Sequence, residues 1–132
     1  MSTLRTNALE GMDAKNSITI VAGAGNITTT NVQEGLAKVW CANSQTAIAD
    51  SFNCASITDN ASGTLTVSYT NNFGSANYGL GVAAQYRRSV YQNSQAAGSI
   101  QFYFTDPNAS ETSGVDIGSA NGCVWAAHGD LA

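Results

Sequence analysis

The sequence feature that most constrains the fold is a two-residue alternation of apolar and polar side chains. It is clearest in residues 64–70 and 99–105, where every second side chain is apolar. The apolar positions are Leu65, Val67, Tyr69, Ile100, Phe102 and Phe104. Because successive side chains of a strand point to opposite faces of a sheet, this pattern predicts antiparallel strands with one buried and one hydrated face.

Shorter segments of the same character recur along the chain, separated by residues that favour turns. Asn, Asp, Gly, Ser and Pro cluster at 59–63, 70–74, 106–108 and 113–114. The segments predicted to be strands are 37–42, 47–53, 55–59, 64–70, 77–86, 99–105 and 122–129. Strands spaced by roughly 8–12 residues are typical of sandwiches and jelly rolls. We therefore predict an all-β fold whose body, residues 37–132, is an antiparallel β-sandwich or jelly-roll-like domain.

Residues 1–36 differ from this body and are predicted to form an extended N-terminal arm. Residues 17–21 alternate as a short strand would, and the glycine-rich segment 22–26 has no large side chain to bury. One helical turn is predicted near 31–36, where Asn31 can act as a cap and Glu34 can return the hydrogen bond. Thirty extended residues reach about 100 Å, enough to lie across and anchor to a neighbouring subunit.

The composition argues for contacts with identical copies rather than with nucleic acid or membranes. Charged residues make up 11% of the 132 residues, whereas ordinary soluble domains have about 25%. Such a surface packs against copies of itself without accumulating like charges. The net charge is −4, and the one cationic pair, Arg87 and Arg88, is too small for a phosphate-binding surface. Residues 2–10 lack the apolar core of a signal peptide, and no apolar run is long enough to span a membrane.

The cysteines and the histidine do not predict a metal site. Cys41, Cys54 and Cys123 are far apart in sequence, and with His128 they form a Cys₃His set without the usual short ligand spacings. Each cysteine has apolar neighbours, and the odd number argues against a disulfide framework. We predict buried, reduced thiols and no metal or cofactor.

No catalytic constellation is evident, and we predict that the protein is not an enzyme. Ser119, His128 and Asp130 can be combined into a triad on paper, but no G-x-S-x-G motif accompanies them. His128 and Asp130 would share a face if the last strand continued through both. A structural role for this pair is the favoured interpretation. The acidic residues are scattered, so a glycosidase-like carboxylate pair is not indicated.

The densest polar and aromatic cluster is the candidate binding site. It consists of Tyr86, Arg87, Arg88 and Tyr91. Tyr and Arg are enriched at interface hot spots, so contact between subunits is the favoured interpretation. A receptor or glycan site, with Tyr stacking on a sugar and Arg binding an anionic group, is the alternative.

Several segments resemble small virion proteins of tailed phages, often marine or cyanobacterial ones. The segments that carry the resemblance are 2–11, 31–40, 50–60, 63–67 and 124–130. Cys54 departs from the family pattern, where valine or another β-branched residue is expected. The resemblance covers most of the chain and includes no catalytic motif.

This resemblance implies an oligomeric, usually trimeric, structural protein made in the host cytoplasm and located in the virion. The expected function is capsid decoration (a cement or head-fibre protein) or a short tail-fibre module anchored by the arm. The expected partners are further copies of the chain, the major capsid protein or tail proteins, and in the tail-fibre case a host surface glycan. A receptor- or carbohydrate-binding module of a tail fibre is the alternative function.

Overall fold

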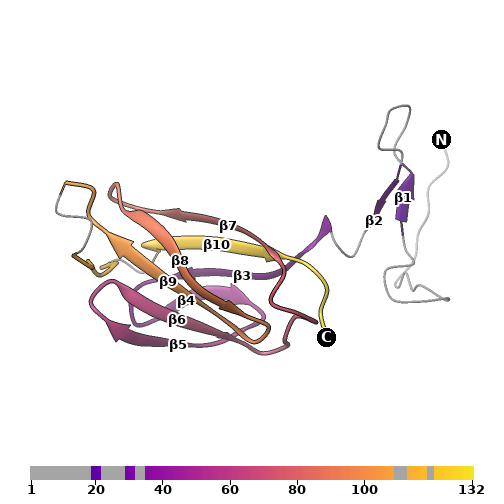
Figure 1. Cartoon of the computed structure of the whole chain (residues 1–132), viewed down its shortest axis with the longest axis horizontal. Helices are drawn as coiled ribbons and strands as arrows, with labels where there is room; N and C mark the ends of the chain where they lie inside the picture. The colour runs from indigo at the N-terminus through magenta and orange to yellow at the C-terminus, as the bar shows by residue number, and fades with distance from the viewer. Residues whose placement is uncertain (1–18, 22–28, 32–34, 109–112, 119–120) are drawn as a thin grey trace. The chain divides into compact units, whose positions relative to one another are not determined.

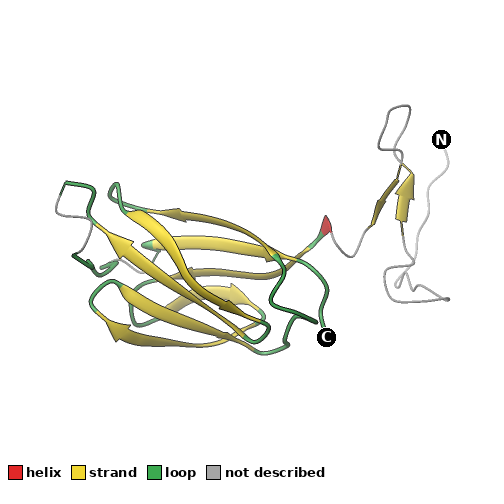
Figure 2. Ribbon diagram, viewed as in Figure 1, coloured by secondary structure: helices red, strands yellow, loops and turns green. Residues whose placement is uncertain are grey.

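The computed structural model describes residues 19–21, 29–31, 35–108, 113–118 and 121–132. In these residues the chain is all-β, and Gly35 is the one helical residue (Figure 2). No helix in the described ranges has the length and apolar character needed to cross a membrane. The chain divides into two units, Met1–Leu36 and Ala37–Ala132, which are described separately.

In the first unit, β1 (Thr19–Val21) pairs with β2 (Thr29–Asn31) in antiparallel register. Thr19 lies opposite Asn31, so the chain reverses direction within this segment rather than running extended throughout. Asn31 is the last residue of β2, and the predicted helical turn is represented by Gly35. The intervening residues 32–34, and most of the predicted arm, lie outside the described residues.

The second unit contains two four-stranded antiparallel sheets, arranged as the layers of a sandwich (Figure 1). The sheet orders are β4-β3-β10-β7 and β5-β6-β9-β8. The strands are β3 (Ala37–Asn43), β4 (Ile48–Phe52), β5 (Cys54–Ala61), β6 (Thr64–Tyr69), β7 (Gly79–Ala84), β8 (Ser89–Ala96), β9 (Ser99–Thr105) and β10 (Cys123–His128). The predicted all-β, antiparallel, sandwich-like architecture is confirmed.

Four connections carry the chain between the two sheets, namely β4–β5, β6–β7, β7–β8 and β9–β10. Between β4 and β5 the change of sheet takes a single residue, Asn53, whose backbone has a positive φ of 61°. The Asn53 side chain secures the corner, because its Oδ1 accepts a 2.7 Å hydrogen bond from the Asn71 backbone N–H. Between β7 and β8 the change of sheet takes residues 85–88. This strand order does not confirm the jelly-roll-like part of the prediction.

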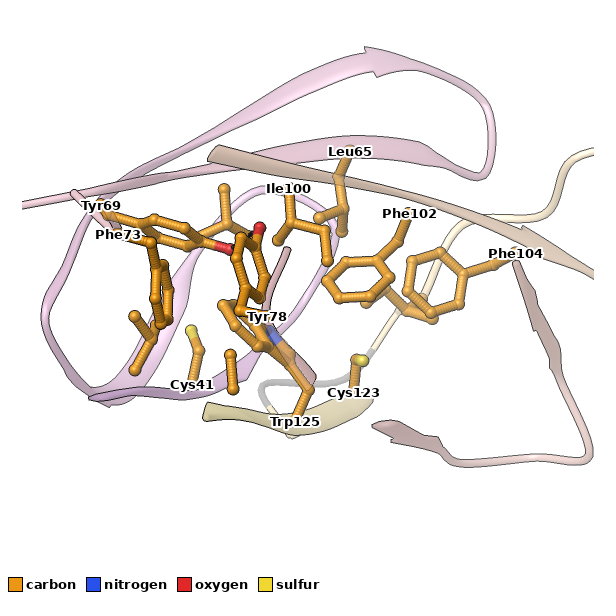
Figure 3. Close-up of a cluster of buried hydrophobic side chains, with 14 residues drawn as sticks. Cys41, Leu65, Tyr69, Phe73, Tyr78, Ile100, Phe102, Phe104, Cys123 and Trp125 are labelled. Carbon is orange, nitrogen blue, oxygen red and sulfur yellow. Dashed lines mark hydrogen bonds between the residues drawn. The ribbon is translucent and has the colours of Figure 1, made fainter. Parts of the chain in front are cut away.

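The core lies between the two sheets and is built from the alternating residues. All six apolar positions predicted from β6 and β9 are buried, from 0% to 6% exposed. The opposite sheet contributes Val39, Cys41, Cys123, Trp125 and Ala127. Figure 3 shows the aromatic rings of both sheets meeting in this layer. The Trp125 ring lies 5.5 Å from that of Phe102 and 6.3 Å from that of Tyr69.

The polar atoms of the buried Trp125, Tyr69 and Tyr78 rings have partners, whereas Gln45 Oε1 and Thr105 Oγ1 have none among the described residues. The Trp125 indole N–H donates to Asn43 Oδ1 at 3.2 Å, and Asn43 is completely buried. The Tyr69 and Tyr78 hydroxyls are 2.7 Å apart, and Tyr78 also donates to the Ser99 carbonyl. Burial raises the pKa of both phenols, which therefore remain neutral donors. Such pairing avoids the cost of about 1–3 kcal/mol for each buried polar group left unsatisfied.

The strand predictions were incomplete at β8 and too long at β7. We predicted no strand at Ser89–Ala96, which nonetheless pairs with β9 along its length. β8 is an edge strand, and its Gln, Asn and Ser residues supply little of the apolar alternation that marks a half-buried strand. The predicted strand 77–86 is shorter, Gly79–Ala84, because the turn into β8 begins at Gln85.

The turn between β5 and β6 generates a stability prediction at Gly63. Its φ is +69°, and an added Cβ would come within 2.5 Å of the Phe104 carbonyl oxygen. We expect Gly63→Ala to lower the free energy of unfolding by about 2 kcal/mol or more, from backbone strain and collision with backbone atoms. Urea denaturation of the full chain measures this change.

The matched control is Gly118→Ala, because an added Cβ at Gly118 would meet no atom within 4 Å. It should leave stability within about 0.5 kcal/mol of the wild type, as is usual for surface substitutions. Equal stability of the two variants would contradict the strain assigned to the Gly63 turn.

Candidate interaction surfaces

The turn between β7 and β8 presents two of the predicted site residues at its tip. The Arg88 N–H approaches the Gln85 carbonyl at 3.4 Å, which closes the turn around Tyr86 and Arg87. These central residues have φ values of 60° and 57°, as in a type I′ turn, here between strands of different sheets. Tyr86 is 75% exposed and Arg87 is also exposed. Non-glycine residues in this conformation cost on the order of 1–3 kcal/mol each, so this turn holds strain.

The other two predicted residues have different surroundings. Arg88 is held by Asp106, with 3.1 Å between Nη1 and Oδ2. The Tyr91 ring lies 6.4 Å from that of Tyr103, a neighbour on β9. The four residues therefore do not converge on one point. Tyr86 and Arg87 form an exposed tip, whereas Arg88 and Tyr91 have partners in the body, and a binding role for any of them stays a prediction.

The tip lies at the end of the sandwich opposite the start of the body. Ala84, which precedes the turn, lies beside Cys123, and Cys123 lies beside Asn43 at the end of β3. The start of β3, Ala37, is instead paired with His128 at the other end of the sheet. The body therefore has one end at which residues 1–36 join it and a distal end that carries Tyr86 and Arg87 (Figure 1).

The outward face of the sheet β5-β6-β9-β8, which we call the polar face, is covered with hydroxyl and amide groups. Its positions include Ser56, Thr58, Thr64, Thr66, Ser68, Ser94, Ser99 and Gln101. Thr66 donates to Asn60 Oδ1 at 2.8 Å, and Gln101 Nε2 donates to Thr66 Oγ1 at 3.0 Å. Asn93 in turn donates to Gln101 Oε1. These hydrogen bonds link all four strands across a hydrated surface.

The outward face of the sheet β4-β3-β10-β7, which we call the apolar face, has the opposite character. Strand register places its positions in rows, and two rows are complete. The first row is Phe52, Trp40, Ala126 and Gly81, and the second is Asp50, Ala42, Val124 and Ala83. The large side chains are open to solvent, with Phe52 54%, Val124 49% and Trp40 36% exposed. These residues expose an apolar surface on a folded domain.

Few charges interrupt the apolar face. Asp50 lies at one end of the second row, and His128 lies beyond the first row, opposite Gly79. Lys38 precedes Trp40 by two residues, but it is buried, with 8% of its surface exposed.

The sequence interpretation missed this surface because it assigned every apolar residue to the core. The signal lay in residues 39–42 and 123–127, which are apolar without a break. Unbroken apolar runs are typical of strands that are covered on both faces.

The Cys41 and Cys54 thiols lie within hydrogen-bonding distance of each other, and this hydrogen bond lowers the pKa of Cys41 and raises that of Cys54. The three cysteines are free; Cys41 and Cys123 are buried as predicted, whereas Cys54 is half-buried. Burial raises the pKa of the Cys123 thiol to about 12, which keeps it protonated and inert near neutral pH. A cluster of three His, Cys, Asp or Glu side chains that could bind a metal ion is absent from the described residues.

The strand geometry does not support a catalytic triad of Ser119, His128 and Asp130. β10 ends at His128, so Asp130 does not continue the strand and the condition for a shared face is not met. Ser119 lies outside the described residues.

Comparison with known proteins gives no relative to which a function can be traced. The chain matches no family model, no curated protein and no solved structure. The resemblance to virion proteins of tailed phages therefore stays an expectation from the sequence.

The strained turn generates a prediction about stability. Replacing Tyr86 by Asn and Arg87 by Gly supplies the residues that type I′ turns favour. We expect the free energy of unfolding to rise by about 1–2 kcal/mol, because Asn and Gly adopt positive φ at less cost. The control, Tyr86→Ala with Arg87→Ala, removes the same side chains but retains the strain and should show no gain. Equal gains in both double variants, measured by urea denaturation, would assign the effect to the side chains.

Proposed function

We propose that this chain is a non-enzymatic structural subunit of a larger assembly on the surface of a phage particle. Within that class it is a capsid decoration protein, of cement or head-fibre type, or a short tail-fibre module. The observation that carries the assembly role is the solvent-open apolar face of the sheet β4-β3-β10-β7. The phage setting and the homotrimer rest on the sequence resemblance.

The contrast between the two outward faces supports the assembly role. Both belong to one small domain, yet one carries a hydrogen-bonded layer of hydroxyls and amides and the other carries Trp40, Phe52 and Val124. The largest exposed apolar patch on a monomer, commonly about 300–600 Å², is often a functional surface. The polar face is the kind of surface that this chain exposes to water. The apolar face is therefore suited to contact with protein.

The low charge of the chain supports the same role. Five cations and nine anions are distributed over 132 residues, so crowded copies repel one another weakly. The position of the Tyr86 and Arg87 tip, opposite the end at which residues 1–36 join, suits a module attached at one end. In this proposal the N-terminal residues anchor the body to the capsid or tail, and the tip points away from the joint.

A glycan-binding module is the second candidate, and one observation favours it. Tyr91 is 43% exposed on the polar face, beside Tyr103 and near the Asn93 and Gln101 amides. Aromatic rings next to amides can stack on a sugar and hydrogen-bond its hydroxyls. Binding of the full chain to host-surface glycans, at least tenfold weaker in Tyr91→Ala but unchanged in the tip variant Tyr86→Ala, would support this candidate. No binding to such a glycan panel would remove it.

The proposed function predicts a fixed copy number of this chain in purified particles. Quantitative mass spectrometry of gradient-purified particles, with labelled peptides of this chain as standards, measures that number. Hundreds of copies per particle are expected for capsid decoration, and a few to a few dozen for a tail module. Decoration also predicts that particles lacking the chain lose heat resistance, whereas a tail module predicts impaired adsorption. Absence of the chain from particles made by cells that express it would overturn the proposal.

A further inference from the structure

We infer that the apolar face is occupied by the apolar face of a second copy of this chain. In this contact the bulky strip of one copy, Trp40 and Phe52, faces the opposite edge of the other copy. Phe52 lies on the flat strip, Gly79, Gly81 and Ala83, and Trp40 lies on the adjacent Ala126. The inference rests on the proposed function as an assembly subunit and names the partner of its surface.

The face is divided into two halves of different relief. Phe52 and Trp40 are neighbours on β4 and β3, at one edge of the sheet. The flat strip is on β7, at the opposite edge, and β10 lies between with Val124 and Ala126. The largest side chains of the face and its smallest residues therefore occupy opposite edges of the same sheet.

This division makes the face complementary to itself. A half-turn about an axis parallel to the strands, midway between β3 and β10, places β4 of one copy over β7 of the other. Phe52 then lies over Gly81 and Trp40 over Ala126, so each large side chain meets a small residue. The two sheets can therefore approach to the roughly 10 Å spacing of stacked sheets. The same strip-to-strip contact repeated around a threefold axis closes a trimer. The partner is a copy of the chain in either symmetry.

The charges on the face are compatible with this partner. The half-turn moves Asp50 over the strand that carries Ala83, and it moves His128 over β3. Neither group is placed opposite its own copy. No like-charge pair therefore opposes the contact, and the rest of the face is uncharged.

Gly81 is a second, independent indication that another backbone approaches the flat strip. A glycine inside a strand destabilises it by roughly 0.5–1 kcal/mol relative to alanine and often marks close approach of another chain. The fold of one copy gives no reason for glycine here, because a Cβ at Gly81 would meet no atom within 4 Å. A Cβ at Gly79 would lie 3.8 Å from its nearest atom, the His128 carbonyl oxygen, which is an ordinary contact.

The size of the face sets the expected strength of association. A buried Trp or Phe removes about 150–250 Å² from water, so the exposed parts of Trp40 and Phe52 amount to roughly 200 Å². With Val124 and the small residues the face offers a few hundred Å², less than the roughly 800 Å² per partner of a standard stable interface. We expect reversible self-association of the isolated chain at micromolar to millimolar concentration, strengthened wherever other contacts hold copies together.

The test uses the full 132-residue chain and measures its mass by sedimentation velocity from about 5 μM to 1 mM. The key variant is Gly81→Val, which adds apolar surface to the flat strip without a clash inside one copy. Contact of Phe52 with Gly81 predicts at least tenfold weaker association of this variant. Nonspecific hydrophobic association predicts stronger association of this variant, because its exposed apolar area is larger. Trp40→Ser should weaken association to a similar extent.

The matched control is Thr58→Val, which replaces a hydroxyl by a methyl group on the exposed polar face and should leave association unchanged. Thermal unfolding of each variant verifies that it is folded. A wild-type chain that stays monomeric at 1 mM would overturn the inference, as would equal association of wild type and Gly81→Val. Either result leaves the proposed function to be judged by the copy number in particles, so the two can fail separately.

Discussion

The indole of Trp125 makes the contact on which the rest of the sandwich depends. Its ring packs against Phe102 and Tyr69 of the opposite sheet, and its N–H donates to the buried Asn43 of the neighbouring strand. The hydrogen bond fits one pairing of β10 with β3, in which Cys123 lies beside Asn43. A shift by one residue would turn Trp125 outward and leave a buried amide without a partner. Core packing and polar satisfaction thus select the same register.

That register also determines the outside of the sheet. Once Trp125 and its alternate neighbours point inward, Val124 and Ala126 must point outward, next to Trp40 and Ala42 of β3. The apolar face therefore has two causes. The core contact fixes which side chains point outward, and in the adjacent strands β3 and β10 the outward positions are apolar as well as the inward ones. A single chain covers one side of this sheet with its core and leaves the other side open to solvent.

The sequence predicted the parts of the structure that follow from local periodicity. Leu65, Phe102 and their alternate neighbours predicted the buried faces of β6 and β9, because apolar side chains at every second position lie on one face of a strand. β8 escaped prediction because its place at the sheet edge demands few apolar residues. The role of Trp40 escaped for a different reason. An apolar side chain looks the same in sequence whether it faces a core or a neighbour, and only the register of Trp40 against Phe52 and Ala126 distinguishes them.

The placement of the chain ends gives the body a direction with practical meaning. The body begins at Ala37 and its last strand ends at His128, side by side at one end of the sandwich, whereas residues 85–88 turn at the other. A peptide grafted after His128 would lie next to the start of the body at Ala37. A peptide grafted into the 85–88 turn would instead be held at the other end, about as far from Ala37 as the sheet is long. A peptide inserted in the 85–88 turn is therefore displayed at the end of the domain that lies opposite the start of the body.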